Sequence, residues 1–206
     1  TSGLNNVAIG YHALKANTTA SHSVAIGFEA LTTNTTSTSH VAIGYRALKA
    51  NTSGSENTVA GSYALQANTT GGSNSAFGGS AMTASVDGGN NAAFGYSSLA
   101  ANTSGSYSTA LGAYALWKNT SASYNTAVGW RAGKEVTTGA DNTIIGVEAG
   151  DALTTGSNNL ILGHDAAASA VDVSNEITLG DTAITKFRVP GLNFSIKDST
   201  ATDNYV

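Results

Sequence analysis

The hydrophobic and polar positions of this chain recur with a period of 17 residues over most of its length. Each repeat contains a short alternating run that ends in glycine, as in VAIG at 7–10, 24–27 and 41–44. The glycine recurs without insertion or deletion at Gly10, Gly27, Gly44, Gly61, Gly78, Gly95, Gly112, Gly129, Gly146, Gly163 and Gly180. A fixed period of this kind indicates stacked structural units rather than one globular core.

The run before each glycine alternates like a β-strand, in which successive side chains point to opposite faces. One face carries Val7, Ile9 and their equivalents, and the other carries Ala8 and its equivalents. A second apolar column lies four residues after the glycine, at Leu14, Leu31, Leu48, Leu65, Met82, Leu99 and Leu116. The repeat is too short for two packed helices, and the glycines would interrupt them. We therefore predict an all-β protein, a parallel β-solenoid or β-roll, with two short strands and two turns per 17-residue coil.

Polar residues mark the turns. Asn and Thr follow the second apolar column, as at Asn17-Thr18 and Asn102-Thr103, and Asn tolerates the left-handed backbone of tight turns. Another asparagine column precedes the strand, at Asn6, Asn57, Asn74, Asn91, Asn125, Asn142 and Asn159. Because stacked asparagines form hydrogen-bonded ladders between strands, we expect such a ladder along the solenoid.

The repeat fades after Gly180, which divides the chain into two predicted regions. Residues 1–180 form the β-roll, and residues 181–206 form an extended C-terminal neck or cap that contains the only proline, Pro190. The chain begins partway through a repeat, so we expect it to be a segment of a longer protein.

Each coil buries only a few large side chains. The free energy gained by burying them is smaller than the entropic cost of ordering 17 residues, so we expect each chain to bury a second face. The alanine column is the predicted contact between chains, because methyl-sized groups let backbones approach closely. An aromatic column after the glycine either packs between subunits or lies exposed, at Tyr11, Phe28, Tyr45, Tyr96 and Trp130. We expect an obligate homo-oligomer with cyclic symmetry.

Composition narrows the functional classes. Charged residues make up 11% of the chain and the net charge is −4, which argues against a basic nucleic-acid-binding surface. The chain has no cysteine, which excludes a disulfide framework and a thiolate metal site. No apolar run approaches the length of a membrane span, so we expect no membrane insertion.

Candidate chemistry is sparse. Glu148, Asp151 and Asp165 lie in neighbouring repeats, where paired carboxylates could form a glycosidase site. The coils are too short and regular to form the walls of a substrate-binding groove. We therefore interpret these acids as surface charge and expect that the protein is not an enzyme. His22 and His40 lie in neighbouring repeats but out of phase, which disfavours a shared metal. The turns lack the repeated aspartates of calcium-binding rolls, and we expect no metal and no cofactor.

A threonine column suggests a competing hypothesis, because flat threonine arrays on β-solenoids bind ice. Six of the eight threonines follow asparagine, and all eight lie in turns instead of on a strand face, which favours a role in capping the corner. They are Thr18, Thr35, Thr52, Thr69, Thr103, Thr120, Thr137 and Thr154.

The strings NNVAIG, SVAIG, NSAFG and NTAVG resemble the head repeats of trimeric autotransporter adhesins. That resemblance implies a homotrimeric, left-handed parallel β-roll. The longer repeat, with GxxAL and NT, is more similar to phage tail-fibre proteins built from the same module. The stretch NEITLGDTAITKFRVPGLNFSIKDS is similar to the segment that precedes the intramolecular chaperone of phage tail fibres and tailspikes.

The resemblance implies a structural and adhesive segment of a trimeric phage tail fibre, located in the virion. Such a rod serves host attachment, and its partner is a host cell-surface glycan or protein receptor. The alternatives are the head of a bacterial trimeric autotransporter adhesin, at the bacterial cell surface, and a glycan-cleaving tailspike. The sequence assigns no catalytic, cofactor or metal residue. Five aromatic residues are candidates either for stacking on sugars or for packing between chains: Tyr107, Tyr114, Trp117, Tyr124 and Trp130.

Overall fold

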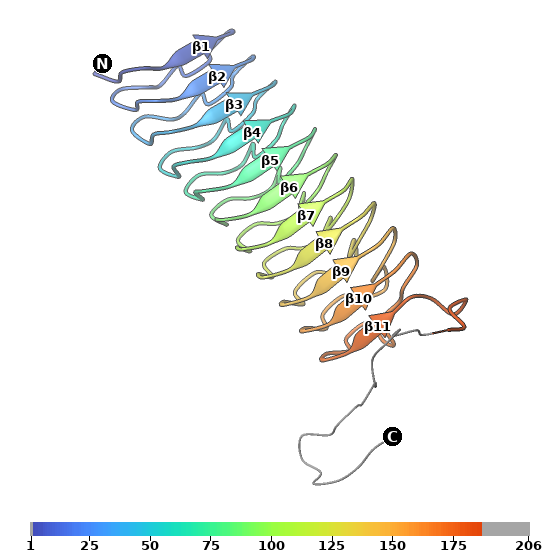
Figure 1. Ribbon diagram of the computed structural model, residues 1–206. Coiled ribbons are helices and arrows are strands. Elements are labelled where there is room, and N and C mark those ends of the chain that lie inside the picture. Colours follow the sequence, from blue (N-terminus) through green and yellow to red (C-terminus); the bar gives the residue numbers. More distant parts are fainter. Residues whose placement is uncertain (1, 187–206) are drawn as a thin grey trace, which may run out of the picture.

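The computed structural model describes residues 2–186, which form a straight rod of stacked coils (Figure 1). Most of the predicted neck, including Pro190, lies outside the described residues. Eleven strands of three residues form one parallel sheet in chain order. They are β1 (Val7–Ile9), β2 (Val24–Ile26), β3 (Val41–Ile43), β4 (Thr58–Ala60), β5 (Ser75–Phe77), β6 (Ala92–Phe94), β7 (Thr109–Leu111), β8 (Thr126–Val128), β9 (Thr143–Ile145), β10 (Leu160–Leu162) and β11 (Ile177–Leu179). The predicted all-β parallel β-solenoid with 17-residue coils is confirmed.

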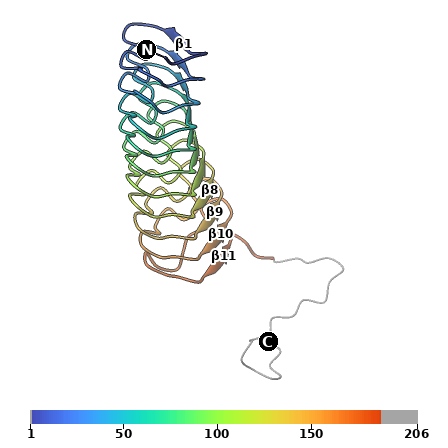
Figure 2. The ribbon, with the colours of Figure 1, turned by 90° about the vertical axis from the view of Figure 1, so that its left-hand side faces the viewer.

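The register between strands is constant. Val7 pairs with Val24 and Ala93 pairs with Ala110, so each residue lies beside the residue 17 positions later. The columns of the sequence are therefore columns along the rod. Figure 2 shows the strands gathered on one side of the rod and the turns on the other.

The alanine column lies inside the roll, so its predicted place between chains is wrong. Ala25, Ala76 and Ala110 are fully buried and pack in one core with the leucine column, for example with Leu48. The first and third residues of each strand point outward, including large ones such as Ile43, which is 40% exposed. The physical reason is the space in each layer: a leucine-sized side chain already fills most of so short a coil, so the residue opposite it is alanine in most coils. Larger residues occur there at Val59, and at Ile144 and Ile161, whose coils hold glycine or alanine in the leucine column.

Within the described residues, only one of the two predicted strands forms in each coil. The segment after the glycine is a series of turns, in which Ala47 N–H donates to Gly44 C=O at 3.3 Å. Leu48 has a φ of 51°, in the left-handed region that L-residues avoid. Its N–H still donates to Ala64 C=O in the next coil at 3.0 Å. Burial of the leucine side chain offsets the cost of this backbone conformation.

The asparagine ladder is confirmed. Asn74 N–H donates to Asn57 Oδ1, and Asn91 N–H donates to Asn74 Oδ1, each at 3.0 Å. Asn74 Nδ2 also donates to Gly88 C=O across the coil at 2.8 Å. Each buried amide therefore ties one coil to the next and also fastens the turn opposite the strand.

The threonine column forms a second ladder at the turns. Thr52 Oγ1 donates to Thr69 C=O, and Thr103 Oγ1 donates to Thr120 C=O, both at 2.9 Å. These hydroxyl hydrogens point along the rod to the backbone of the next coil. The contacts are those that a corner-capping role requires.

Candidate interaction surfaces

The outer face of the sheet carries a largely apolar surface, which is interrupted at β4 by Thr58 and Ser62 and further along by single threonines. We call it the strand-face strip: the first and third residues of each strand together with the residue that follows the glycine. Eleven strands spaced about 4.8 Å apart give the strip a length of roughly 50 Å. Its most exposed large members are Val7, Ile9, Tyr11, Phe28, Ile43, Tyr45, Phe94, Tyr96, Leu111, Trp130, Ile145, Val147, Ile177 and Leu179. Exposed apolar residues that recur along one face of a rod are typical of a protein–protein contact.

Aromatic rings stack along the strip because the register places like residues in adjacent coils. The rings of Tyr11, Phe28 and Tyr45 follow one another with centroids 5.3 Å apart. Phe77 and Phe94 stack at 4.7 Å. These ladders hold the exposed rings in fixed positions, so the strip is a preorganised surface.

Several charged side chains form ion pairs between neighbouring coils, in the turns that follow the strip. The Glu29 carboxylate accepts from Lys49 Nζ at 2.7 Å and from Arg46 Nε at 2.9 Å. The hydrogen bond from Lys49, followed by that from Arg46, holds the pKa of the Glu29 carboxyl below its usual value. Further along the rod, Arg131 Nη1 lies 3.0 Å from Glu148 Oε1.

A hollow of about 340 Å³ opens among these turns, and we call it the aromatic hollow. It is lined by Tyr114, Trp117, Arg131, Lys134 and Glu135. The ring of Tyr114 lies nearly perpendicular to that of Trp117, at 86°, with centroids 6.0 Å apart. The hollow therefore combines aromatic rings with cations and one carboxylate.

The five aromatic candidates from the sequence separate into three places. Tyr114 and Trp117 line the aromatic hollow. Trp130 belongs to the strip, with the Arg131 guanidinium 4.1 Å from its ring centroid. Tyr107 and Tyr124 stack on each other, 5.2 Å apart and almost parallel, and both are more than half exposed.

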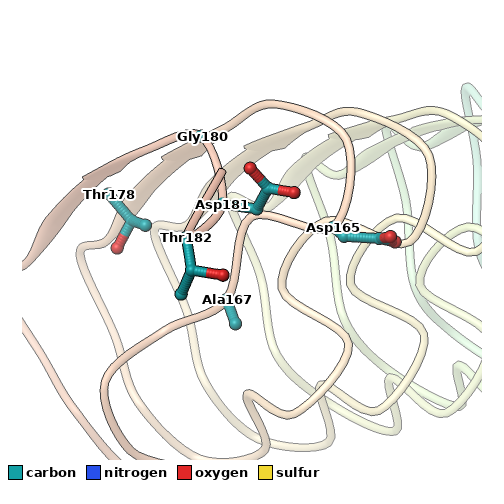
Figure 3. Close-up of a pocket in the computed structure, with 6 residues that line it drawn as sticks. All are labelled: Asp165, Ala167, Thr178, Gly180, Asp181 and Thr182. Atoms are coloured by element: carbon teal, nitrogen blue, oxygen red, sulfur yellow. The ribbon is translucent and has the colours of Figure 1, made fainter. Parts of the chain in front are cut away.

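A second hollow, of about 460 Å³, lies at the C-terminal end of the roll. Figure 3 shows the carboxylates of Asp165 and Asp181 and the hydroxyls of Thr178 and Thr182 pointing in different directions. Asp165 lies 3.2 Å from His164, measured between its Oδ2 and the histidine Nδ1. Among residues 2–186, no three histidine, aspartate or glutamate side chains gather as a metal site requires.

The acids considered for a glycosidase site and the histidines considered for a metal site do not come together, because each has a different neighbour. Glu148 is held by Arg131, and Asp165 neighbours His164, so these two acids are engaged at different places. His22 Nε2 lies 3.3 Å from Asn5 Nδ2 at the surface. His40 occupies the buried asparagine column, and burial lowers its pKa to about 4.

The described residues contain no helix long and apolar enough to cross a membrane. Comparisons with protein-family models, curated proteins and solved structures found no match for the chain. The geometry of the described residues leaves two candidate interaction surfaces, the strand-face strip and the aromatic hollow.

Proposed function

We propose that this chain is a structural and adhesive segment of a trimeric phage tail fibre, and that it forms a rigid rod used for attachment to a host surface. The observation that carries the proposal is the strand-face strip. A regular rod that exposes Ile43, Phe94, Ile145 and their equivalents in one line has a surface suited to lateral assembly.

A second copy of the same chain is the occupant that fits the strip best. The strip is roughly 50 Å long and about 13 Å wide, since it spans about four residue steps of extended chain. Its area is therefore about 650 Å² per chain, which a ring of copies divides between two neighbours, where a standard stable interface of two proteins buries roughly 800 Å² per partner. Parallel copies bring surfaces with the same coil spacing against each other, and cyclic symmetry covers the strip of every copy. The number three comes from the resemblance of the repeats to trimeric adhesin heads.

Attachment follows from the rod form and not from an enzyme site. A stiff rod holds its outer surface away from the particle that bears it, and several rods on one particle convert weak contacts into avidity. The partner in this proposal is a host cell-surface glycan or protein. The role is structural and adhesive, without a cofactor.

The oligomeric mass tests the proposal. Analytical ultracentrifugation of the chain should give a mass three times the 20.6 kDa of one copy. A double variant, Ile43→Glu with Ile145→Glu, places charge in the strip and should yield smaller species or aggregates. The control, Ser53→Glu with Thr155→Glu, adds the same charge to exposed turn positions of the same two coils and should leave the mass unchanged. A folded, monodisperse monomer of the unaltered chain would refute the proposal.

The AIG motif also suits the head of a bacterial trimeric autotransporter adhesin, and the rest of the gene separates the two candidates. A downstream intramolecular chaperone supports the tail fibre. A coiled-coil stalk followed by a membrane anchor supports the adhesin.

A further inference from the structure

We propose that the aromatic hollow binds one pyranose unit that carries a carboxylate, so that the glycan recognised by this rod is acidic. The inference deepens the proposed attachment function and rests on it for the setting in which the rod meets a glycan. The site itself is argued from Tyr114, Trp117, Arg131, Lys134 and Glu135.

Trp117 is the only aromatic residue in its column among the described coils. Trp117 stands five residues after its glycine, where the described coils otherwise hold lysine, threonine, glutamine, alanine or aspartate. Trp117 is 40% exposed, and the nearly perpendicular ring of Tyr114 forms a wall beside it. The C–H face of a pyranose is flat and apolar, and it stacks on an exposed indole while the hydroxyls at its edge stay in water.

The polar half of the site is held by ion pairs between coils. Lys118 pairs with Glu135, and Arg131 pairs with Glu148 at 3.0 Å. Both pairs fix side chains that line the hollow or border it. The Glu135 carboxylate is thereby positioned to accept hydrogen bonds from sugar hydroxyls.

Lys134 is the cation lining the hollow that takes part in neither of these ion pairs. Within residues 2–186 no carboxylate lies within ion-pair distance of its ammonium group. The acid in the same column of the next coil is Asp151, which makes no such pair with it. A hollow with one surplus cation beside an aromatic ring selects a ligand with an apolar face and an anionic substituent, as in a uronic or sialic acid.

The size and place of the hollow favour a single sugar over a peptide segment. Its volume of about 340 Å³ lies at the low end of the range for small-ligand sites, and its five lining residues come from two neighbouring coils. It borders the strand-face strip without belonging to it, because Arg131 packs over Trp130 of the strip. An assembly through the strip therefore carries the hollow at its rim, once per chain.

Fluorine NMR of the assembled chain labelled with 5-fluorotryptophan tests the proposal, since the chain has only two tryptophans. Methyl β-glucuronide should shift the Trp117 signal with a Kd of about 1 mM and leave the Trp130 signal in place. Methyl β-glucoside, which lacks the carboxylate, should bind at least about fivefold more weakly.

Four variants separate the contributions. Lys134→Gln should reduce the affinity for the glucuronide to that for the glucoside, and Asp151→Asn should leave it unchanged or strengthen it. Lys15→Gln is the matched control, because Lys15 occupies the same column in the first coil beside no tryptophan, and it should bind as the unaltered chain does. Trp117→Leu removes the fluorine reporter, so its binding is followed on the proton NMR signals of the glucuronide. The broadening of these signals that the unaltered chain causes should be lost in this variant.

Each contrary outcome overturns the inference. No movement of the Trp117 signal with either sugar at about 50 mM would show that the hollow is not a sugar site. Equal affinity for glucuronide and glucoside would show that Lys134 does not select an acid. Stronger binding of a diglutamate peptide than of the glucuronide would assign the hollow to an acidic peptide. Failure here with an intact trimeric mass would leave the proposed rod function standing, so the two failures are distinguishable.

Discussion

Replacing Gly78 by alanine tests how closely the coils stack. Gly78 follows β5 with a φ of +132°, and a Cβ there would lie 2.6 Å from Gly95 O and 2.7 Å from Gly95 C in the next coil. Both are backbone atoms of a stacked coil, so they cannot rotate away as a side chain would. A non-glycine residue in such a conformation costs about 1–3 kcal/mol, and overpacking adds about 1–3 kcal/mol. We expect Gly78→Ala to lower the free energy of unfolding by about 2–6 kcal/mol.

The neighbouring glycine supplies the control. A Cβ on Gly79 would lie 3.4 Å from Tyr96 Cδ2, an ordinary contact with a side chain, and its φ is outside the left-handed region. Gly79→Ala should therefore change stability by less than about 0.5 kcal/mol. Unfolding in guanidinium chloride at matched protein concentration, followed by circular dichroism, compares the two variants. Equal midpoints for both would refute the argument that the glycine column sets the approach of the coils.

Two further predictions concern the buried ladder. Asn74→Ala leaves Asn91 N–H and Gly88 C=O buried without partners, and should lower the free energy of unfolding by about 2–5 kcal/mol. Asn74→Ser is the control, because its hydroxyl keeps an acceptor for Asn91 N–H. Hydrogen exchange at the Asn91 amide should be faster in the alanine variant alone. Burial lowers the pKa of His40 to about 4, so the unfolded chain binds more protons than the folded chain between about pH 4 and 6.5. Stability should then fall as pH drops through that window, by about 2.5 kcal/mol at pH 4.5 relative to pH 7; His40→Asn should lack this loss in unfolding curves, and identical pH dependence in both chains would contradict the assignment.

The period of the sequence was sufficient to predict the solenoid, the coil length and the asparagine ladder, but not which strand face is the interior. Alternation distinguishes two faces without orienting them, and large apolar residues such as Ile43 normally mark the core. Here Ala42 is inside because Leu48 already fills the centre of its layer. The predominance of alanine in that column was a usable signal, with Val59, Ile144 and Ile161 as exceptions, whereas the outer positions vary more widely, from Ala60 to Phe94.

The same 17-residue columns could have predicted the aromatic hollow. Tyr114 and Arg131 are 17 residues apart, as are Trp117 and Lys134, so the period alone places each pair in adjacent coils. An aromatic residue considered alone gives no indication of that pairing. The ion pairs around the hollow depend on side-chain conformations, which a column does not specify, and only the structure shows that Lys134 is left over.

The unvarying offset between paired residues has an evolutionary consequence. Because every coil meets its neighbours through the same positions, as Val7 does with Val24 and Ala93 with Ala110, excising or duplicating one repeat restores the same contacts at the junction. Recombination between the gene segments that encode these similar repeats would lengthen or shorten the rod in steps of about 4.8 Å. The distance that such a rod spans can then be adjusted independently of its packing, much as a stack of identical tiles changes height without changing its footprint.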